Sequence, residues 1–288
     1  MSTTQKKALW PTLIISALGL SVLAFAATRK VPGTLTAEVR ATAAQNSVAP
    51  ANDKGEDYVR AGRLLPQLRW NLKALGDRLE KPGKERLTMT GTLSRASDSG
   101  PVPVLMIMEF PDRLRLELQG VGPHHVITFN GKSAGKVGGL LDQSEEDLIE
   151  TLVYDTAEHF FGGQSRGTAT RFLGEHFRLD GGGQANEAGP FYDVYQTTER
   201  IRHTVPPRQQ TQLYCFNSDT RLLERISYEL LRNGFRTTVE IRIGGWQKVQ
   251  DQQIPLRVVR LENNQPALTL TINRVAVSPK IIDGAFGN

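Results

Sequence analysis

The residues of this sequence that could perform acid–base or metal chemistry are few and far apart. Of five histidines only His124 and His125 are adjacent, and neighbouring strand residues point to opposite faces, which makes them a poor pair of metal ligands. The run Glu145-Glu146-Asp147 stands where a helix should begin, beside the positive end of its dipole. No nucleophile-elbow, zinc-protease or phosphate-loop motif is present. We therefore expect no enzyme, no catalytic residue, no metal and no cofactor.

The only cysteine, Cys215, lies in the apolar sequence Leu-Tyr-Cys-Phe at 213–216. A single cysteine forms neither an intramolecular disulfide nor a cysteine-based metal site. Its surroundings offer no base and no sign of exposure, which a reactive thiol requires. The sequence predicts that Cys215 is a small buried hydrophobic residue.

The formal net charge is +5, and the basic residues are spread along the expected strands. A nucleic-acid-binding protein needs a basic stripe with stacking aromatic residues, so we expect no nucleic acid as a partner. Weak attraction to an anionic membrane surface remains open. We expect the strand arginines to form a solvated convex face, with contact to anionic headgroups or an acidic partner as the alternative: Arg113, Arg115, Arg225, Arg242, Arg257 and Arg260.

Apolar residues are the better candidates for binding a ligand. They occupy every second position in three successive segments and include three of the four methionines: Leu87, Met89, Met106, Met108, Phe110, Leu114 and Leu116. Alternate strand positions share one face. Methionine adapts to variable shapes, and each methylene group removed from water contributes about 0.8 kcal/mol. These residues can present one apolar face to a ligand; the alternative is that they are only core.

The same period-two pattern continues through most of the chain. It predicts strands near 87–93, 104–110, 113–118, 125–130, 192–195, 212–216, 222–230, 237–243, 254–261 and 268–277. The turns between them are short, with Asn130-Gly131 the strongest hairpin signal, so an antiparallel meander is expected. The apolar parity of the last strand changes after Ile272, which predicts a bulge near Asn273-Arg274, and Gly244-Gly245 suggest another. Residues 167–183 are ambiguous between strand and loop.

Two segments have helical rather than strand periodicity. Residues 56–80 carry leucines at 64, 68, 72, 75 and 79, with Pro66 near the start, and predict a helix packed on the sheet or, alternatively, on a membrane surface. Residues 144–161 predict a helix capped by Ser144. Glycine pairs at 138–139 and 162–163 flank this second helix and suggest a lid that swings, against a static packed helix. Its apolar face is expected to comprise Leu148, Leu152, Phe160 and Phe161.

The N-terminus has the three parts of a secretory signal. Lys6 and Lys7 precede an apolar run at 8–27, and Ala24-Phe25-Ala26 ends it with small residues. We expect a signal peptide at 1–26, a flexible linker at 27–55 and one domain at 56–288. The mature protein would then be periplasmic. Because the apolar run nearly suffices to span a bilayer, an uncleaved inner-membrane anchor facing the periplasm is the alternative.

Four parts of the chain have motifs of a known family: Pro-Asp-Arg-Leu-Arg-Leu at 111–116, the tyrosine- and leucine-rich hairpin at 214–226, the segments 245–249 and 254–257, and the tail at 281–286. From residue 86 to 286, with the helix before, the chain therefore resembles the periplasmic outer-membrane lipoprotein-carrier (LolA/LolB-like) superfamily. Its long linker and large 144–183 segment depart from the carriers. Known carriers have an unclosed barrel whose apolar interior, covered by short helices, takes acyl chains, which implies that the seven apolar residues named above line an acyl-binding groove here.

The resemblance and the pattern together give one expectation. The fold class is mainly β with helices (α+β), a strongly curved antiparallel sheet that forms an open half-barrel covered by helices. The expected function is a monomeric periplasmic carrier or chaperone for lipid acyl chains or lipoprotein, with an envelope protein or the membrane surface as possible partner. The alternative is a membrane-anchored envelope sensor or interaction module of the same fold.

Overall fold

The computed structural model describes residues 66–76, 79, 85–110, 113–120, 125–166, 168–179, 190–201, 208–232, 234–280 and 284–286. The expected signal peptide or anchor, the linker and the first ten residues of the predicted helix at 56–80 lie outside the described residues. No helix in the described ranges is both long enough and apolar enough to cross a membrane.

One antiparallel sheet of twelve strands forms the framework, in the order β5-β4-β3-β2-β1-β14-β13-β10-β9-β8-β7-β6. Its strands are β1 (Glu85–Arg95), β2 (Val102–Glu109), β3 (Arg113–Leu118), β4 (His125–Asn130), β5 (Ala134–Lys136), β6 (Ala169–Phe177), β7 (Tyr192–Ile201), β8 (Arg208–Asn217), β9 (Leu223–Arg232), β10 (Phe235–Gly244), β13 (Arg257–Glu262) and β14 (Gln265–Pro279). Two meanders therefore meet where the first strand pairs with the last. The ambiguous segment 167–183 contains the edge strand β6.

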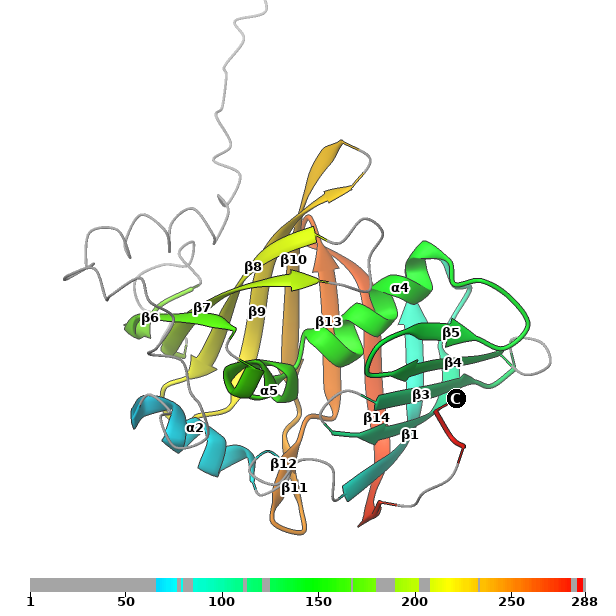
Figure 1. The fold of residues 1–288 in the computed structure, drawn as a ribbon, viewed down its shortest axis with the longest axis horizontal. Helices are drawn as coiled ribbons and strands as arrows, with labels where there is room; N and C mark the ends of the chain where they lie inside the picture. The colour runs from blue at the N-terminus through cyan, green and yellow to red at the C-terminus, as the bar shows by residue number, and fades with distance from the viewer. Residues whose placement is uncertain are drawn as a thin grey trace, which may run out of the picture. The chain divides into compact units, whose positions relative to one another are not determined.

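The sheet is strongly curved and open. Strands β3, β4 and β5 run across the direction of β9, β10 and β13, so the sheet turns through a large angle between its two ends (Figure 1). Strands β5 and β6 are its two edges and do not pair with each other, which leaves the barrel unclosed. The predicted fold class, an open curved antiparallel sheet with helices, is confirmed.

The junction between the two meanders contains the predicted bulge. Thr90 pairs with Arg274 and Gly91 pairs with Ile272, so Asn273 is the extra residue in β14. At this point the backbones come unusually close, because a Cβ built on Gly91 would lie 2.0 Å from the carbonyl oxygen of Thr271. The bulge switches the inward parity of β14, as the sequence indicated.

We expected a bulge at the paired glycines 244–245, but they lie where β10 ends. The strand ends at Gly244, and Gly245 adopts a φ of +64°. The chain then leaves the sheet and forms a separate hairpin of β11 (Gln247–Val249) and β12 (Gln252–Ile254) before it returns as β13. Left-handed backbone at Gly245 thus marks an exit from the sheet.

The first helix, α2 (Pro66–Leu75), begins with proline at its first position, where the missing N–H is not needed. It is shorter than the predicted 56–80 at its C-terminal end. Gly76 terminates it with a φ of +101°, and a Cβ there would lie 2.5 Å from the carbonyl oxygen of Asp251. Leu68 and Leu75 are fully buried with residues of β7–β10, so the leucine face packs on the sheet as expected.

The helix predicted at 144–161 is in fact three pieces. These are α4 (Gln143–Ile149), the π-helical turn η1 (Glu150–Tyr154) and α5 (Ala157–Arg166). The N-cap is Asp142 rather than Ser144, because Asp142 and Glu145 form a reciprocal capping box with two 2.9 Å hydrogen bonds. The expected stop at 162–163 is also wrong, since both glycines lie inside α5.

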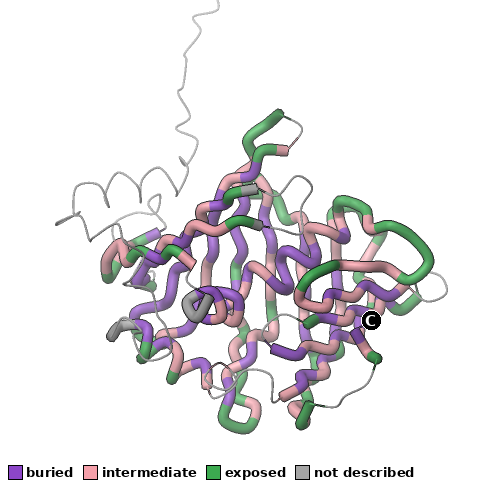
Figure 2. The backbone as a smooth tube through the Cα atoms, in the orientation of Figure 1, coloured by how far each residue is buried: buried purple, intermediate pink, exposed green. Residues whose placement is uncertain are grey.

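Topology places these helices over the concave face. The chain must pass from the edge strand β5 to the opposite edge strand β6, and α4, η1 and α5 carry it across (Figure 1). Residues of α4 and η1 pack on β1–β4 and β14, while those of α5 pack on β7–β10. The buried residues accordingly follow the sheet and this crossing segment (Figure 2). We call residues 143–166 the helical cover.

The close approach at the bulge leads to a stability prediction. Gly91→Ala should lower the free energy of unfolding by about 2 kcal/mol, since the clashing atom belongs to the backbone of the central strand and cannot turn away. Gly100→Ala is the control, because a Cβ at Gly100 meets nothing within 4 Å. Urea unfolding measures both variants. Equal midpoints would show that the sheet relaxes at no cost.

Candidate functional site

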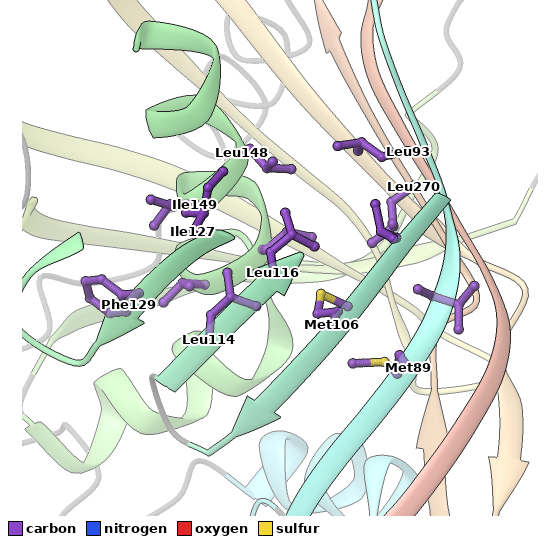
Figure 3. Packing of buried hydrophobic residues seen from close by; sticks show 14 of the residues in the cluster. Met89, Leu93, Met106, Leu114, Leu116, Ile127, Phe129, Leu148, Ile149 and Leu270 are labelled. Carbon is purple, nitrogen blue, oxygen red and sulfur yellow. The ribbon is translucent and has the colours of Figure 1, made fainter. Parts of the chain in front are cut away.

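Two rows of apolar side chains cross the concave face of the N-terminal half of the sheet. The register places Met89, Met106, Leu116 and Ile127 in one row and Leu87, Met108, Leu114 and Phe129 in the next. Most of these residues are buried, and Met108 is partly buried. Figure 3 shows Leu148 and Ile149 of α4 on the same side of these strands as their labelled apolar side chains. The predicted sharing of one face by alternate residues is therefore correct for these strands.

A cavity remains between these rows and the helical cover. It lies under the junction of η1 and α5, has a volume of about 60 Å³, and its lining is mostly apolar. Strands β1 and β2 form one side, β14 and the end of β10 another, and Trp246, Ile254 and Pro255 close it. One water needs roughly 10–15 Å³ on this measure, so the cavity holds about five water- or methylene-sized groups.

Five of the seven predicted groove residues line this cavity: Leu87, Met89, Met106, Met108 and Phe110. The other two, Leu114 and Leu116, are fully buried in the core beneath η1 and α4. The cavity wall also includes Trp246, Ile254 and Val258, which the sequence reasoning did not single out. Both parities of β13 carry apolar residues, so the pattern alone did not reveal which of them face inward.

The four predicted cover residues have different surroundings. Leu152 lines the cavity, whereas Leu148 is fully buried in the core below α4. Phe160 and Phe161 pack away from the cavity, on the aromatic residues of β7 and β8. The Phe160 ring lies 4.7 Å from that of Tyr214 and 5.4 Å from that of Phe216. The α5 part of the cover is thus held by aromatic packing.

A buried arginine fixes the middle of the cover to the sheet. Arg260 of β13 is 1% exposed and lies on the concave face. Its two terminal guanidinium nitrogens lie 3.8 Å from carboxylate oxygens of the cover. Its Nε donates a hydrogen bond to Glu262 at 3.0 Å. Arg232 of β9 adds a second cation beside Asp147 and Glu262. The acidic partners on the cover are Asp147, Glu150 and Asp155.

Hydrogen bonds extend this cluster across the sheet. Tyr228 donates to Asp155 Oδ2 at 2.7 Å, and Gln212 donates to its Oδ1 at 2.8 Å. Tyr214 in turn donates to Gln212 at 2.9 Å. Burial, together with the negative charge of Asp155, raises the pKa of Tyr228 well above its usual value, which keeps the phenol protonated as a donor. These four side chains thus join the cover to β8 and β9 through hydrogen bonds.

The electrostatics of Asp147 show that the cluster is crowded with negative charge. Burial raises its pKa, the two arginines Arg260 and Arg232 lower it, and the neighbouring Glu262 and Glu150 raise it again, with a net upward shift. Burial lowers the pKa of Arg260, but the negative charges of Glu150, Asp155 and Asp147 raise it above its ordinary value, so Arg260 stays charged. One fixed cation therefore holds several acids in place.

The expectation of a solvated arginine face is wrong for Arg260, which is turned inward. Arg113 and Arg115 do lie on the convex face, but both contact the C-terminal tail. Arg115 donates to the carbonyl oxygen of Ala285 at 3.1 Å, and the guanidinium of Arg113 lies 6.0 Å from the ring centre of Phe286. These arginines hold the tail against the sheet.

Little in the described residues suggests catalysis or metal binding. Burial raises the pKa of the Cys215 thiol to about 12, so the thiolate is not formed near neutral pH, and the prediction of a buried hydrophobic cysteine is correct. Within these same ranges, histidine, cysteine and carboxylate residues nowhere gather in threes that could hold a metal ion. The arrangement can enclose an apolar group, and its ionisable side chains support the cover.

The fold and the cavity together define a class: an open, curved antiparallel sheet with a helical cover over an apolar recess. Among solved structures, the chain is similar to a LolA superfamily protein from Nitrosomonas europaea, with a TM-score of 0.51 at 10% identity over 76% of this chain and 97% of that one. The fold is therefore LolA-like.

Two further solved structures are more distant. A putative outer membrane lipoprotein-sorting protein domain from Vibrio parahaemolyticus gives a TM-score of 0.39 at 11% identity, over 73% of this chain and 95% of that one. A DUF1329 family protein from Desulfovibrio piger gives 0.43 at 9% identity, over 74% and 90%. A scan of family models gives no match, and a search of curated proteins finds no relative.

The Arg260 cluster predicts a large effect of a single substitution. Arg260→Met should lower the free energy of unfolding by about 3–5 kcal/mol, because several buried acids lose their main cation. Amide exchange should quicken most in η1. Arg242→Met, which removes a half-exposed partner of Glu240, is the control and should change stability by less than about 0.5 kcal/mol. Similar losses in both variants would contradict this role of Arg260.

Proposed function

We propose that this protein is a periplasmic carrier that binds an acyl chain of a lipid or a lipid-modified protein in the cavity beneath its helical cover. The observation that supports it is the cavity itself, whose wall includes five residues chosen from the sequence as an acyl-binding face. The LolA-like fold adds support, since the carriers that the sequence resembles hold acyl chains inside such a shell.

The size of the cavity implies that the cover moves when a chain enters. About five methylene groups fit, and their burial contributes about 4 kcal/mol, which is useful but short of the full length of a lipid chain. Longer chains need α4 and η1 to lift from the methionine rows. Gly138, with a φ of +84°, and Gly139 form an open connection that can serve as the hinge. Gly163 cannot, because it packs inside α5 against Thr168.

The Arg260 cluster would then set the free energy of opening. Lifting the cover separates Arg260 from acids that are themselves buried, so an empty protein stays closed. Opening breaks apolar contacts between the cover and the sheet. An acyl chain in the cavity makes new apolar contacts in their place. In this proposal the protein is exported to the periplasm, catalyses no reaction, and takes up its ligand when the helical cover opens as a lid.

A second candidate function is that of an interaction module, the alternative named above, here one that contacts a membrane surface; the tip of the β9–β10 hairpin favours it. Leu231 and Phe235 are 75% and 76% exposed there, and Arg236 beside them is exposed too. The hairpin projects from the sheet at the top of Figure 1, and its tip is coloured as exposed in Figure 2. Two large apolar side chains beside a cation suit the interface of an anionic bilayer.

The carrier proposal predicts that natively purified protein releases acyl lipid on organic extraction. Met108→Gln keeps the side-chain length but places an amide in the cavity wall, so the affinity for a fluorescent fatty-acyl probe should fall roughly tenfold. Leu140→Gln, at a residue that is 93% exposed, is the control and should bind as the unaltered protein does. An extract without lipid, together with unchanged binding by Met108→Gln, would refute the proposal.

The docking candidate predicts that the hairpin tip binds vesicles. In the form beginning at residue 27, replacing Leu231 and Phe235 with serine should reduce the fraction that floats with phosphatidylglycerol vesicles at least fivefold, since the apolar area leaves the interface. Leu140→Ser removes an exposed leucine elsewhere and should float normally. Equal flotation of all three proteins would exclude the hairpin as a membrane contact.

A further inference from the structure

Three exposed arginines form a diagonal stripe across the convex face of the sheet. Arg242 of β10 pairs with Val259, and Arg257 lies two residues away from Val259 on β13. Arg257 in turn pairs with Thr271 of β14, and Arg274 follows two pairing positions later, after the bulge. All three arginines are exposed, and their strands lie side by side in Figure 1. We call Arg242, Arg257 and Arg274 the arginine stripe.

The geometry of the sheet sets the spacing of the stripe. Neighbouring strands lie about 4.8 Å apart, and two residues along a strand advance by about 6.7 Å, so successive arginines start about 8 Å apart. Their guanidinium groups can therefore bind three separate anionic groups. Like charges on one face of a sheet also repel one another, which costs stability in the protein alone.

The fold itself offers little negative charge to offset this repulsion. Within the described part of the chain, the side chains of Arg257 and Arg274 form no ion pair or hydrogen bond, and the convex positions of β13 and β14 carry no acidic residue. Glu240 beside the stripe is only 6% exposed, and it is shared between Arg242 at 2.6 Å and Arg225 at 3.8 Å. The stripe thus presents cations that an acidic partner can neutralise.

The shape of the stripe favours an extended acidic polypeptide over a lipid bilayer. In an extended chain every second side chain projects from one side at intervals of about 6.7 Å, close to the spacing of the arginines. Each carboxylate can accept two parallel hydrogen bonds from a guanidinium group, and the exposed Thr90 opposite Arg274 adds a hydroxyl donor. A flat bilayer meets a convex face only along a narrow line, and the large exposed apolar side chains of the described residues lie elsewhere.

We propose that the arginine stripe binds an extended acidic segment of a partner protein, with one carboxylate against each arginine. The net charge of +5 attracts such a segment from a distance. The inference goes beyond the carrier proposal and does not depend on it, because the stripe and the cavity lie on opposite faces of the sheet. A partner can therefore dock on the convex face whether the helical cover is open or closed.

The test measures the fluorescence anisotropy of a labelled peptide of five Glu-Thr repeats with the full-length protein. Combining Arg257→Gln with Arg274→Gln should weaken binding roughly fivefold, since two ion pairs to the peptide are lost. The midpoint of urea unfolding should stay the same or rise, because these arginines have no partner within the described part of the chain.

The matched control combines Lys132→Gln with Arg171→Gln. It removes the same charge from two exposed residues at the opposite edges of the sheet, and its affinity for the peptide should stay within twofold of that of the unaltered protein. Equal weakening in both double variants would show attraction by net charge alone and would overturn the inference.

A second measurement needs no variant. In the unaltered protein, the Nε–H resonances of Arg257 and Arg274 should shift when the peptide is added, and unchanged resonances would also overturn the inference. Phosphatidylglycerol vesicles separate the two kinds of partner. If the Arg257 and Arg274 substitutions abolish flotation with vesicles but leave peptide binding unchanged, the stripe contacts a bilayer and the inference is wrong. Lipid extraction and acyl-probe binding, which test the carrier proposal, are unaffected by these results.

Discussion

The position of the helical cover depends on one buried charge. Arg260 reaches from the middle of the sheet to acids on α4, η1 and the residue after η1. Topology requires only that the chain cross from β5 to β6, and many paths across a curved sheet would satisfy it. A guanidinium surrounded by carboxylates selects one of these paths, because any other would leave buried charge uncompensated. The cavity lies beneath the part of the cover that this contact joins to the sheet.

The cluster also lies between two parts of the concave face. Beside β8 and β9, Tyr228 and Gln212 hydrogen-bond to Asp155, and aromatic side chains pack on α5. Beside β1, β2 and β14 the face is apolar and less completely filled. The hydrogen bonds that hold the cover are therefore concentrated in one part, and the unfilled apolar surface lies in the other.

The sequence predicted the sheet well because its signals are local. Period-two alternation placed Met89 and Met106 on one face, and the parity change after Ile272 located the bulge. The prediction from sequence was wrong where ion pairs between residues far apart in the chain determine the structure. Arg260 shares a short strand with the exposed Arg257, and its acidic partners on the cover are more than a hundred residues earlier in the chain. The single helix expected at 144–161 likewise has good periodicity, but Asp155 is drawn to Tyr228 and interrupts it.

That interruption lies directly above the cavity. In η1 the backbone N–H of Asp155 bonds to the carbonyl oxygen of Glu150, five residues earlier, and the helix restarts only at Ala157. An uninterrupted helix would continue the apolar face over Leu87 and Met108 and fill the space with its own side chains. Instead the chain turns at Asp155, and the cavity lies under the turn. The widened turn that breaks the helical periodicity and the buried ion cluster thus share one residue, Asp155, which ends η1 and accepts hydrogen bonds from the sheet.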